Sequence, residues 1–252
     1  MKPGAAFEDY VQFVYHTLLN LKGERVQVSR RTTFRLPSGE AYEVDVYYEF
    51  LNVGVRHRVA IECKDWSTPV DQGKVLEFHQ KIKNIGENVV GVFVSRSGYQ
   101  SGAIAVAARH GILTLKADDV PTIPQLLAGQ IRASLIPEID CFGEPFWYIA
   151  ELSGDPTEGT GTYYAFPKGS PVHVPLFFSK IHAQAYHAQL PDKKLYGVFG
   201  MPQYKLRGLL AFAVPQKIVF GIIIGMPLLG GEVKLMPVGA EQLRVEYLLQ
   251  NQ

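Results

Sequence analysis

The polar and apolar positions of the first part of the chain change their period in a regular order. Apolar residues at helical spacing run from Phe7 to Leu21, and Gly23 follows them as a helix stop. Apolar and polar residues then alternate, which is typical of half-buried strands, and turn-forming residues separate the alternating segments. The strands predicted from this alternation span residues 24–34, 42–48 and 55–64. The chain should therefore open with one helix and three strands joined by tight turns.

The pattern then changes back and forth between helix and strand. The elements predicted in this part are a helix over 71–85, a buried valine-rich strand over 89–95, an alanine-rich helix over 103–110 and a strand over 112–115. Helices that alternate with strands along a chain are typical of an α/β fold. We therefore predict an α/β domain over residues 1–120.

Strand alternation also predicts which side chains share a face. On the second strand it sets Tyr42, Val44, Val46 and Tyr48 on one face and Asp45 on the other. On the third strand, Glu62 and Lys64 share a face and Cys63 points away from it. The prediction is that Asp45, Glu62 and Lys64 lie on one face of a hairpin, opposite the valine stripe.

The rest of the chain has a different organisation. Residues 121–143 are rich in proline, with a short helical piece at 123–133, and we interpret them as a linker or docking helix. Beyond them, the predicted strands are 146–152, 162–166, 172–178 and 219–224, and the predicted helices are 179–190 and 203–213. This pattern indicates a smaller α+β domain over 144–252. The apolar stretch 208–231 is interrupted by Pro215, Gln216 and Lys217, so no membrane span is expected.

Charge and cysteine content limit the possible functions. The 252 residues carry a formal net charge of +1, and neither half holds a hidden basic excess. Any contact with nucleic acid must therefore use a local patch. Cys63 and Cys141 are too few for a disulfide framework and lack zinc-site spacing. Together with a start that lacks the apolar core of a signal peptide, they predict a cytoplasmic protein.

The predicted hairpin carries residues suited to phosphodiester hydrolysis. Hard cations such as Mg²⁺ or Mn²⁺ prefer oxygen ligands, often one or two carboxylates, and Asp45 and Glu62 meet that need. The backbone carbonyl of Cys63, rather than its thiol, is a further candidate ligand. Lys64 can orient or deprotonate a water molecule, and a desolvated site beside cations would lower its pKa for that task.

Arginines gather at the ends of the predicted strands. The candidates for DNA phosphate contact are Arg30, Arg31, Arg35, Arg56 and Arg58, with Arg96 between Ser95 and Ser97 as a separate candidate. The alternative is a solvated basic rim.

The segment 59–66, Val-Ala-Ile-Glu-Cys-Lys-Asp-Trp, resembles the Glu-Cys-Lys strand of Mrr-like restriction endonucleases, which belong to the PD-(D/E)xK superfamily. The resemblance covers residues 1–116. It also includes Phe7-Glu8, Glu43-Val-Asp45-Val, Val92-Phe-Val-Ser95, Ser97-Gly98, Gly102-Ala103 and His110-Gly-Ile112.

The resemblance implies a restriction-endonuclease-like mixed central sheet flanked by helices. It also implies that Asp45 and Glu62 are metal ligands and that Lys64 is the catalytic lysine, with Glu8 as an accessory acidic residue. Glu8 also has a simpler interpretation, since an acidic residue in a first helical turn stabilises the helix dipole. Val44 replaces the superfamily's proline, and Gln80 is similar to a glutamine of some relatives.

Residues 145–252 faintly resemble SseB-type domains, which implies a module for protein interaction or specificity. We therefore predict a Mg²⁺-dependent DNA endonuclease with an Mrr-like role in restriction or genome defence. Cutting both strands of a duplex would favour a homodimer. The alternatives are a catalytically inactive DNA-binding or protein-interaction module on the same scaffold, and a nuclease that acts on RNA.

Overall fold

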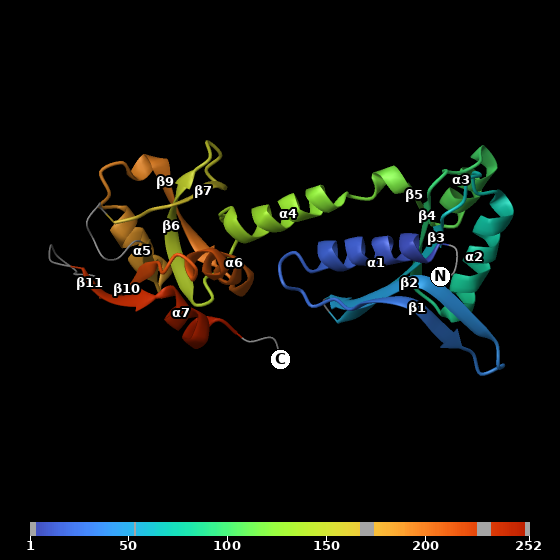
Figure 1. The fold of residues 1–252 in the computed structure, drawn as a ribbon, viewed down its shortest axis with the longest axis horizontal. Helices are drawn as coiled ribbons and strands as arrows, with labels where there is room; N and C mark the ends of the chain where they lie inside the picture. Colours follow the sequence, from blue (N-terminus) through green and yellow to red (C-terminus); the bar gives the residue numbers. More distant parts are fainter. Residues whose placement is uncertain (1–3, 53, 167–173, 226–232, 250–252) are drawn as a thin grey trace. The chain divides into compact units, whose positions relative to one another are not determined.

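The computed structural model describes residues 4–52, 54–166, 174–225 and 233–249. The chain divides into two compact units, residues 1–127 and 128–252 (Figure 1). The division falls inside helix α4 (Ile123–Leu135), within the segment interpreted above as a linker or docking helix. Each unit has its own sheet and its own buried clusters.

The first unit has the predicted order of helix, three strands, helix, strand, helix and strand. Its elements are α1 (Ala5–Leu19), β1 (Val28–Arg35), β2 (Ala41–Asn52), β3 (Val55–Lys64), α2 (Gln72–Ile85), β4 (Val89–Ser95), α3 (Ser101–Arg109) and β5 (Leu113–Lys116). A short 3₁₀ turn, η1 (Ala117–Asp119), follows β5.

The sheet of this unit is mixed, with strand order β1-β2-β3-β4-β5. The β1-β2 and β2-β3 pairs are antiparallel, whereas β3-β4 and β4-β5 are parallel. Helix α1 packs on one face, and α2 and α3 pack on the other (Figure 1). The predicted α/β fold with a mixed central sheet flanked by helices is confirmed.

The prediction that the apolar residues of β2 from Tyr42 to Tyr48 share one face is wrong. Val46 and Tyr48 belong to the cluster under α1, but Val44 belongs to the cluster under α2 and α3. The pairing of β2 with β3 ends at Val46 and Ile61, and Arg31, in the neighbouring strand β1, has a left-handed backbone with φ of 51°. The regular alternation therefore breaks at Asp45, between the two valines.

The second unit is an α+β arrangement around one sheet. Its strands are β6 (Phe146–Leu152), β7 (Gly159–Tyr163), β8 (Val174–Phe177), β9 (Tyr196–Met201), β10 (Val219–Gly225) and β11 (Lys234–Gly239). Its helices are α5 (Lys180–His187), α6 (Gln203–Ala213) and α7 (Ala240–Tyr247), with a 3₁₀ turn η2 (Lys193–Leu195). The sheet order is β11-β10-β8-β6-β7, and β9 also pairs with β6.

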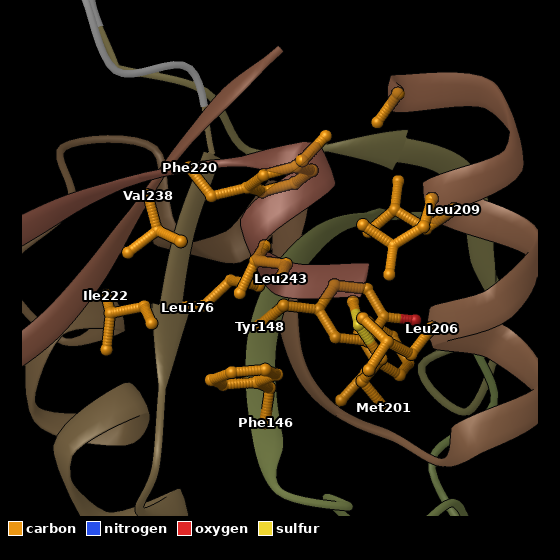
Figure 2. Close-up of a cluster of buried hydrophobic side chains, with 14 of the residues drawn as sticks. Phe146, Tyr148, Leu176, Met201, Leu206, Leu209, Phe220, Ile222, Val238 and Leu243 are labelled. Carbon is orange, nitrogen blue, oxygen red and sulfur yellow. The ribbon is translucent and has the colours of Figure 1, made fainter. Parts of the chain in front are cut away.

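The core of this unit is aromatic and aliphatic. Tyr148 and Phe146 of β6 face Leu206 and Leu209 of α6, while Leu243 of α7 closes the cluster (Figure 2). Three elements were not predicted from the sequence, namely β9, β11 and α7.

The structure also bears on the apolar stretch 208–231. Its first part belongs to α6 and its middle to β10, and residues 226–231 lie outside the described residues. Across the described ranges, no helix has both the length and the hydrophobicity required to cross a membrane.

Candidate functional site

Asp45 lies where β2 parts from β3. Its Oδ2 accepts a hydrogen bond of 2.7 Å from the backbone N–H of Cys63. Because a strand's N–H points toward the neighbouring strand within the sheet, the Asp45 carboxylate lies beside β3 rather than above one of its faces. This corrects the expectation that Asp45, Glu62 and Lys64 project from one common face.

Glu62 on β3 is a buried carboxylate, with 7% of its surface exposed. Its Oε1 lies 2.6 Å from Nζ of Lys64, as alternation along one strand allows. Its Oε2 lies 2.7 Å from Nζ of Lys81, a residue of α2. The same ammonium of Lys81 donates to the backbone carbonyl of Glu43 at 2.9 Å. Glu62 is therefore held by two lysines.

The sequence pattern does not single out Lys81 as a site residue. The only available signal was its position three residues after Phe78, which belongs to the buried stripe of α2. Gln80, which is similar to a glutamine of some relatives, donates to Asn84 at 2.9 Å on the exposed side of the helix.

The charge of Glu62 raises the pKa of both Asp45 and Lys64. Burial, and then the charge of Glu62, raise the pKa of Asp45 to about 6. Burial alone would lower the pKa of Lys64, but the charge and hydrogen bond of Glu62 outweigh it, so the pKa is raised. The pKa of Lys64 was expected to be lowered beside cations, whereas the carboxylate of Glu62 raises it here. Lys64 is a fixed ammonium here.

Cys63 lies between Glu62 and Lys64 but points to the other face. Its side chain is buried in the cluster under α1. Burial, and then the charge of Asp45, raise the pKa of the thiol well above its ordinary value. Since the thiolate is the form that binds metals, the thiol is unsuited to the role and only the backbone carbonyl is left as a candidate ligand.

Glu8 and Arg31 form an ion pair between α1 and β1. Nε of Arg31 lies 2.7 Å from Oε2 of Glu8, and both side chains are largely buried. In the β1-β2 register Arg30 faces Val46 and Thr32 faces Val44, so Arg31 lies opposite Asp45. The hydrogen bond with Glu8, with added effects of Glu43 and Asp45, raises the pKa of Arg31. Arg31 thus lies beside the acidic residues rather than on an outer rim.

The other predicted arginines do not all lie near the site. Arg30 pairs with Asp9, and Arg96 pairs with Asp65 and lies 5.3 Å from the ring centroid of Phe7. The backbone N–H of Arg96 donates to the carbonyl of Lys64 at 3.0 Å, which sets Arg96 at the site.

Arg56 and Arg58 lie toward the opposite end of β3. Arg56 is eight residues from Lys64, which corresponds to about 26 Å along a strand. It pairs with Glu49 at 3.3 Å, and Arg58 donates to the hydroxyl of Tyr47 at 3.1 Å. Arg35 is exposed at the end of β1.

The two serines beside Arg96 serve the loop after β4. Ser95 is buried and donates to the carbonyl of Gly98 at 3.0 Å, and Ser97 donates to the carbonyl of Thr68. The loop geometry thus accounts for both hydroxyl groups.

A small pocket with a cavity volume of about 50 Å³ opens on the α2 side of Glu62. Its lining residues are Glu62, Lys64, Trp66, Lys74, Glu77, Phe78 and Lys81. Within the described residues, one group of three donor side chains lies close enough to share a metal ion, namely Glu138, Asp140 and Cys141. That group belongs to the second unit, whereas the predicted site belongs to the first.

Comparison with known proteins finds a family similar to the first unit. Residues 4–122 match the family model of the Mrr catalytic domain, described as a restriction endonuclease. No curated protein matches the chain.

Several solved structures show a partial likeness to this chain. The MspJI restriction endonuclease in complex with a 27-mer oligonucleotide is 15% identical over 52% of this chain and 28% of its own, with a TM-score of 0.31. The DNA modification-dependent restriction endonuclease AspBHI is 19% identical over 51% and 30%, with a TM-score of 0.32. Can2 from Sulfobacillus thermosulfidooxidans, in complex with cyclic tetra-adenylate, is 18% identical over 51% and 35%, with a TM-score of 0.38.

The alignments thus span about half of this chain and no more than 35% of any of these three proteins. The family match covers the sheet of the first unit together with Asp45, Glu62 and Lys64. Residues 4–122 are therefore similar to the restriction endonuclease domain of the Mrr family.

Proposed function

We propose that this protein is an endonuclease that hydrolyses DNA phosphodiester bonds with Mg²⁺ or Mn²⁺, in a restriction or genome-defence role. One observation carries the proposal: Asp45 is bonded to the backbone of the strand that presents Glu62 and Lys64, within a domain of a nuclease family.

The chemistry of these residues fits a hard cation. Asp45 and Glu62 are two partly desolvated carboxylates close enough for the charge of one to raise the pKa of the other. A divalent cation would relieve that repulsion, and one or two carboxylates are the ligand set that Mg²⁺ usually takes from a protein. Asp45, Glu62 and the backbone carbonyl of Cys63 would hold it. When bound, it would neutralise phosphate charge and make a water molecule nucleophilic near neutral pH.

The remaining groups position the reactants. The ammonium of Lys64 can donate a hydrogen bond to the attacking water and offset charge that develops on the phosphate oxygens. Glu62 fixes this ammonium at 2.6 Å, so the water would meet a donor already in place. Glu8 acts through Arg31, which lies opposite Asp45. Arg96, next to Lys64, is our candidate for a neighbouring DNA phosphate.

One observation favours an alternative function. Both carboxylate oxygens of Glu62 are occupied by lysine ammonium groups, Lys64 on one and Lys81 on the other. The two lysine ammonium groups can balance the charge of Glu62 in place of a metal cation. A DNA-binding module that has lost catalysis would need such a balance, because it would bind no cation. The alternative is therefore an inactive DNA-binding or interaction module on the same scaffold.

The wider setting follows from the same proposal. A homodimer would bring two sites to the two strands of a duplex. Residues 144–252 would bind a protein partner or contribute specificity. The cysteine usage favours the cytoplasm, since both described cysteines are free thiols.

Cleavage assays test the proposal. Plasmid and linear DNA, with and without modified bases, are incubated with the protein in Mg²⁺, in Mn²⁺ and in chelator, beside Asp45→Asn, Lys64→Ala and the exposed control Lys83→Gln. We expect the cation to be required and both site variants to lose activity. Asp45→Asn removes a carboxylate ligand of the cation, and Lys64→Ala removes a donor to the developing charge, a loss that usually costs about 100-fold or more.

Two results would decide against cleavage. Undiminished cutting by Asp45→Asn and Lys64→Ala would refute the assigned site. DNA binding by the wild-type protein without cutting under any condition would establish the alternative function.

A further inference from the structure

We propose that the pocket beside Glu62 binds a second phosphate of the substrate strand, adjacent to the one that is cut, through Lys74 and Lys81. This inference rests on the proposed nuclease function and adds a binding site to it.

The position of the pocket makes it part of the substrate path. Glu62 and Lys64 form one of its walls, so the pocket opens directly onto the residues assigned to cleavage. Adjacent phosphates of a single strand are separated by one nucleotide. A group bound here would therefore be a close neighbour of the scissile phosphate on the same strand.

The charge of the pocket favours an anion. Its lining includes three lysines and two glutamates, which leaves one positive charge in excess. Nζ of Lys74 lies 2.7 Å from Glu77, and Nζ of Lys81 lies 2.7 Å from Glu62. These carboxylates hold the ammonium groups at the pocket. A phosphate can share the remaining donors, since each ammonium has three.

The size of the pocket favours a phosphate over a base. Its cavity volume of about 50 Å³ is room for about three to five waters at roughly 10–15 Å³ each. That space suits the oxygens of a phosphate group. Trp66 forms an aromatic wall and is 39% exposed, so a sugar or base outside the pocket can pack against it.

The solvent exposure of the two lysines differs in a way that separates their roles. The side chain of Lys81 is 19% exposed and also bonds the carbonyl of Glu43, whereas that of Lys74 is 42% exposed. Lys74 can therefore be replaced without disturbing Glu62. This makes Lys74 the residue to test.

Equilibrium binding to a 30-base-pair duplex in Ca²⁺ measures the contact, with product analysis to verify that the strands stay intact. For each phosphate neutralised, the logarithm of the affinity changes with the logarithm of salt concentration by a slope of about −0.9. We expect Lys74→Gln to reduce the steepness of the slope by about one unit. Lys83→Gln, an exposed lysine of the same helix outside the pocket, should leave the slope unchanged.

A second variant has the opposite expected sign. Glu77→Gln removes the carboxylate that competes for Lys74, so it should tighten binding. The site is located by replacing single phosphates near the mapped cut with neutral methylphosphonates. At one flanking position, the methylphosphonate should weaken DNA binding by the wild-type protein. The same methylphosphonate should not weaken binding by Lys74→Gln any further, because the variant already lacks the contact.

The outcomes separate the two proposals. If the wild-type protein cuts DNA but Lys74→Gln keeps the full salt slope and Glu77→Gln binds no tighter, the pocket does not bind phosphate and the nuclease function stands. If the wild-type protein neither binds nor cuts DNA, both proposals fail.

Discussion

At the scale of single residues, Arg31 of β1 has a strained backbone and lies next to Glu8 and Asp45. Arg31 adopts a left-handed backbone, which costs about 1–2 kcal/mol for a residue with a Cβ atom. Such conformations persist where the surrounding structure enforces them, often at functional sites. Here the surroundings are Glu8, which accepts from the guanidinium, and Asp45, which lies opposite in the register.

The strained backbone predicts that a glycine variant at position 31 is more stable than an alanine variant. Arg31→Gly and Arg31→Ala both remove the guanidinium, but only glycine adopts this backbone without a penalty. We expect the glycine variant to be more stable than the alanine variant by about 1 kcal/mol. Urea unfolding followed by circular dichroism measures the difference. An alanine variant as stable as the glycine variant would mean that the left-handed backbone is not retained.

At the scale of elements, the site depends on two strands that separate and one helix that lies close to the sheet. The β2-β3 ladder ends at the pair of Val46 and Ile61, which leaves the N–H of Cys63 free to bind Asp45. Helix α2 packs on the face of the sheet opposite α1, where it brings Lys81 to Glu62. The site is thus assembled from strand separation and helix packing.

The close packing of α2 on β4 depends on Gly91. A Cβ atom at this position would lie 2.9 Å from Cδ1 of Ile82 and 3.2 Å from Cε1 of Phe78, both buried residues of α2. We expect Gly91→Ala to destabilise the protein by about 1–3 kcal/mol, the usual cost of an overpacked core. Because the displaced helix carries Lys81, cleavage should also fall.

Gly102→Ala is the matched control for Gly91→Ala. Its Cβ atom would meet only the end of the exposed Gln72 side chain, at 3.3 Å, and alanine is favoured over glycine in a helix such as α3. The control should be as stable as the wild-type protein or more so. Equal stabilities of Gly91→Ala and the control in urea unfolding would contradict the close packing.

At the scale of the whole molecule, each unit carries its own buried clusters. The clusters of the first sheet draw on residues between Phe7 and Leu126, and those of the second sheet on residues between Phe146 and Leu248. Helix α4 contributes Leu126 to the first set, and in its last turn the carbonyl of Ala133 accepts from the buried Lys205 at 2.8 Å.

This arrangement predicts that the first unit folds alone. A fragment of residues 1–136, which keeps α4 whole, should unfold cooperatively and retain cation-dependent cleavage, since it contains every residue assigned to the site. Thermal unfolding and the plasmid assay are the measurements. A fragment that unfolds gradually, while the full chain unfolds cooperatively, would show that the second unit is needed for folding.

The sequence alone determined the order of elements in the first unit and the family model that this unit matches. It also determined that Glu62 and Lys64 share a face while Cys63 points away, because alternation is a local property of one strand. It was less informative for the second unit, where the short glycine-containing segments of β9 and β11 have no clear alternation.

The tertiary structure decided how the site is assembled. It set Asp45 beside β3, paired Arg31 with Glu8, brought Lys81 from α2 to Glu62, and separated Arg56 and Arg58 from the site. None of these follows from local pattern, because each depends on contacts between elements distant in sequence. Strand register, the point where two strands separate and the packing of a helix on a sheet are set by the whole fold, and they decide which charged groups meet.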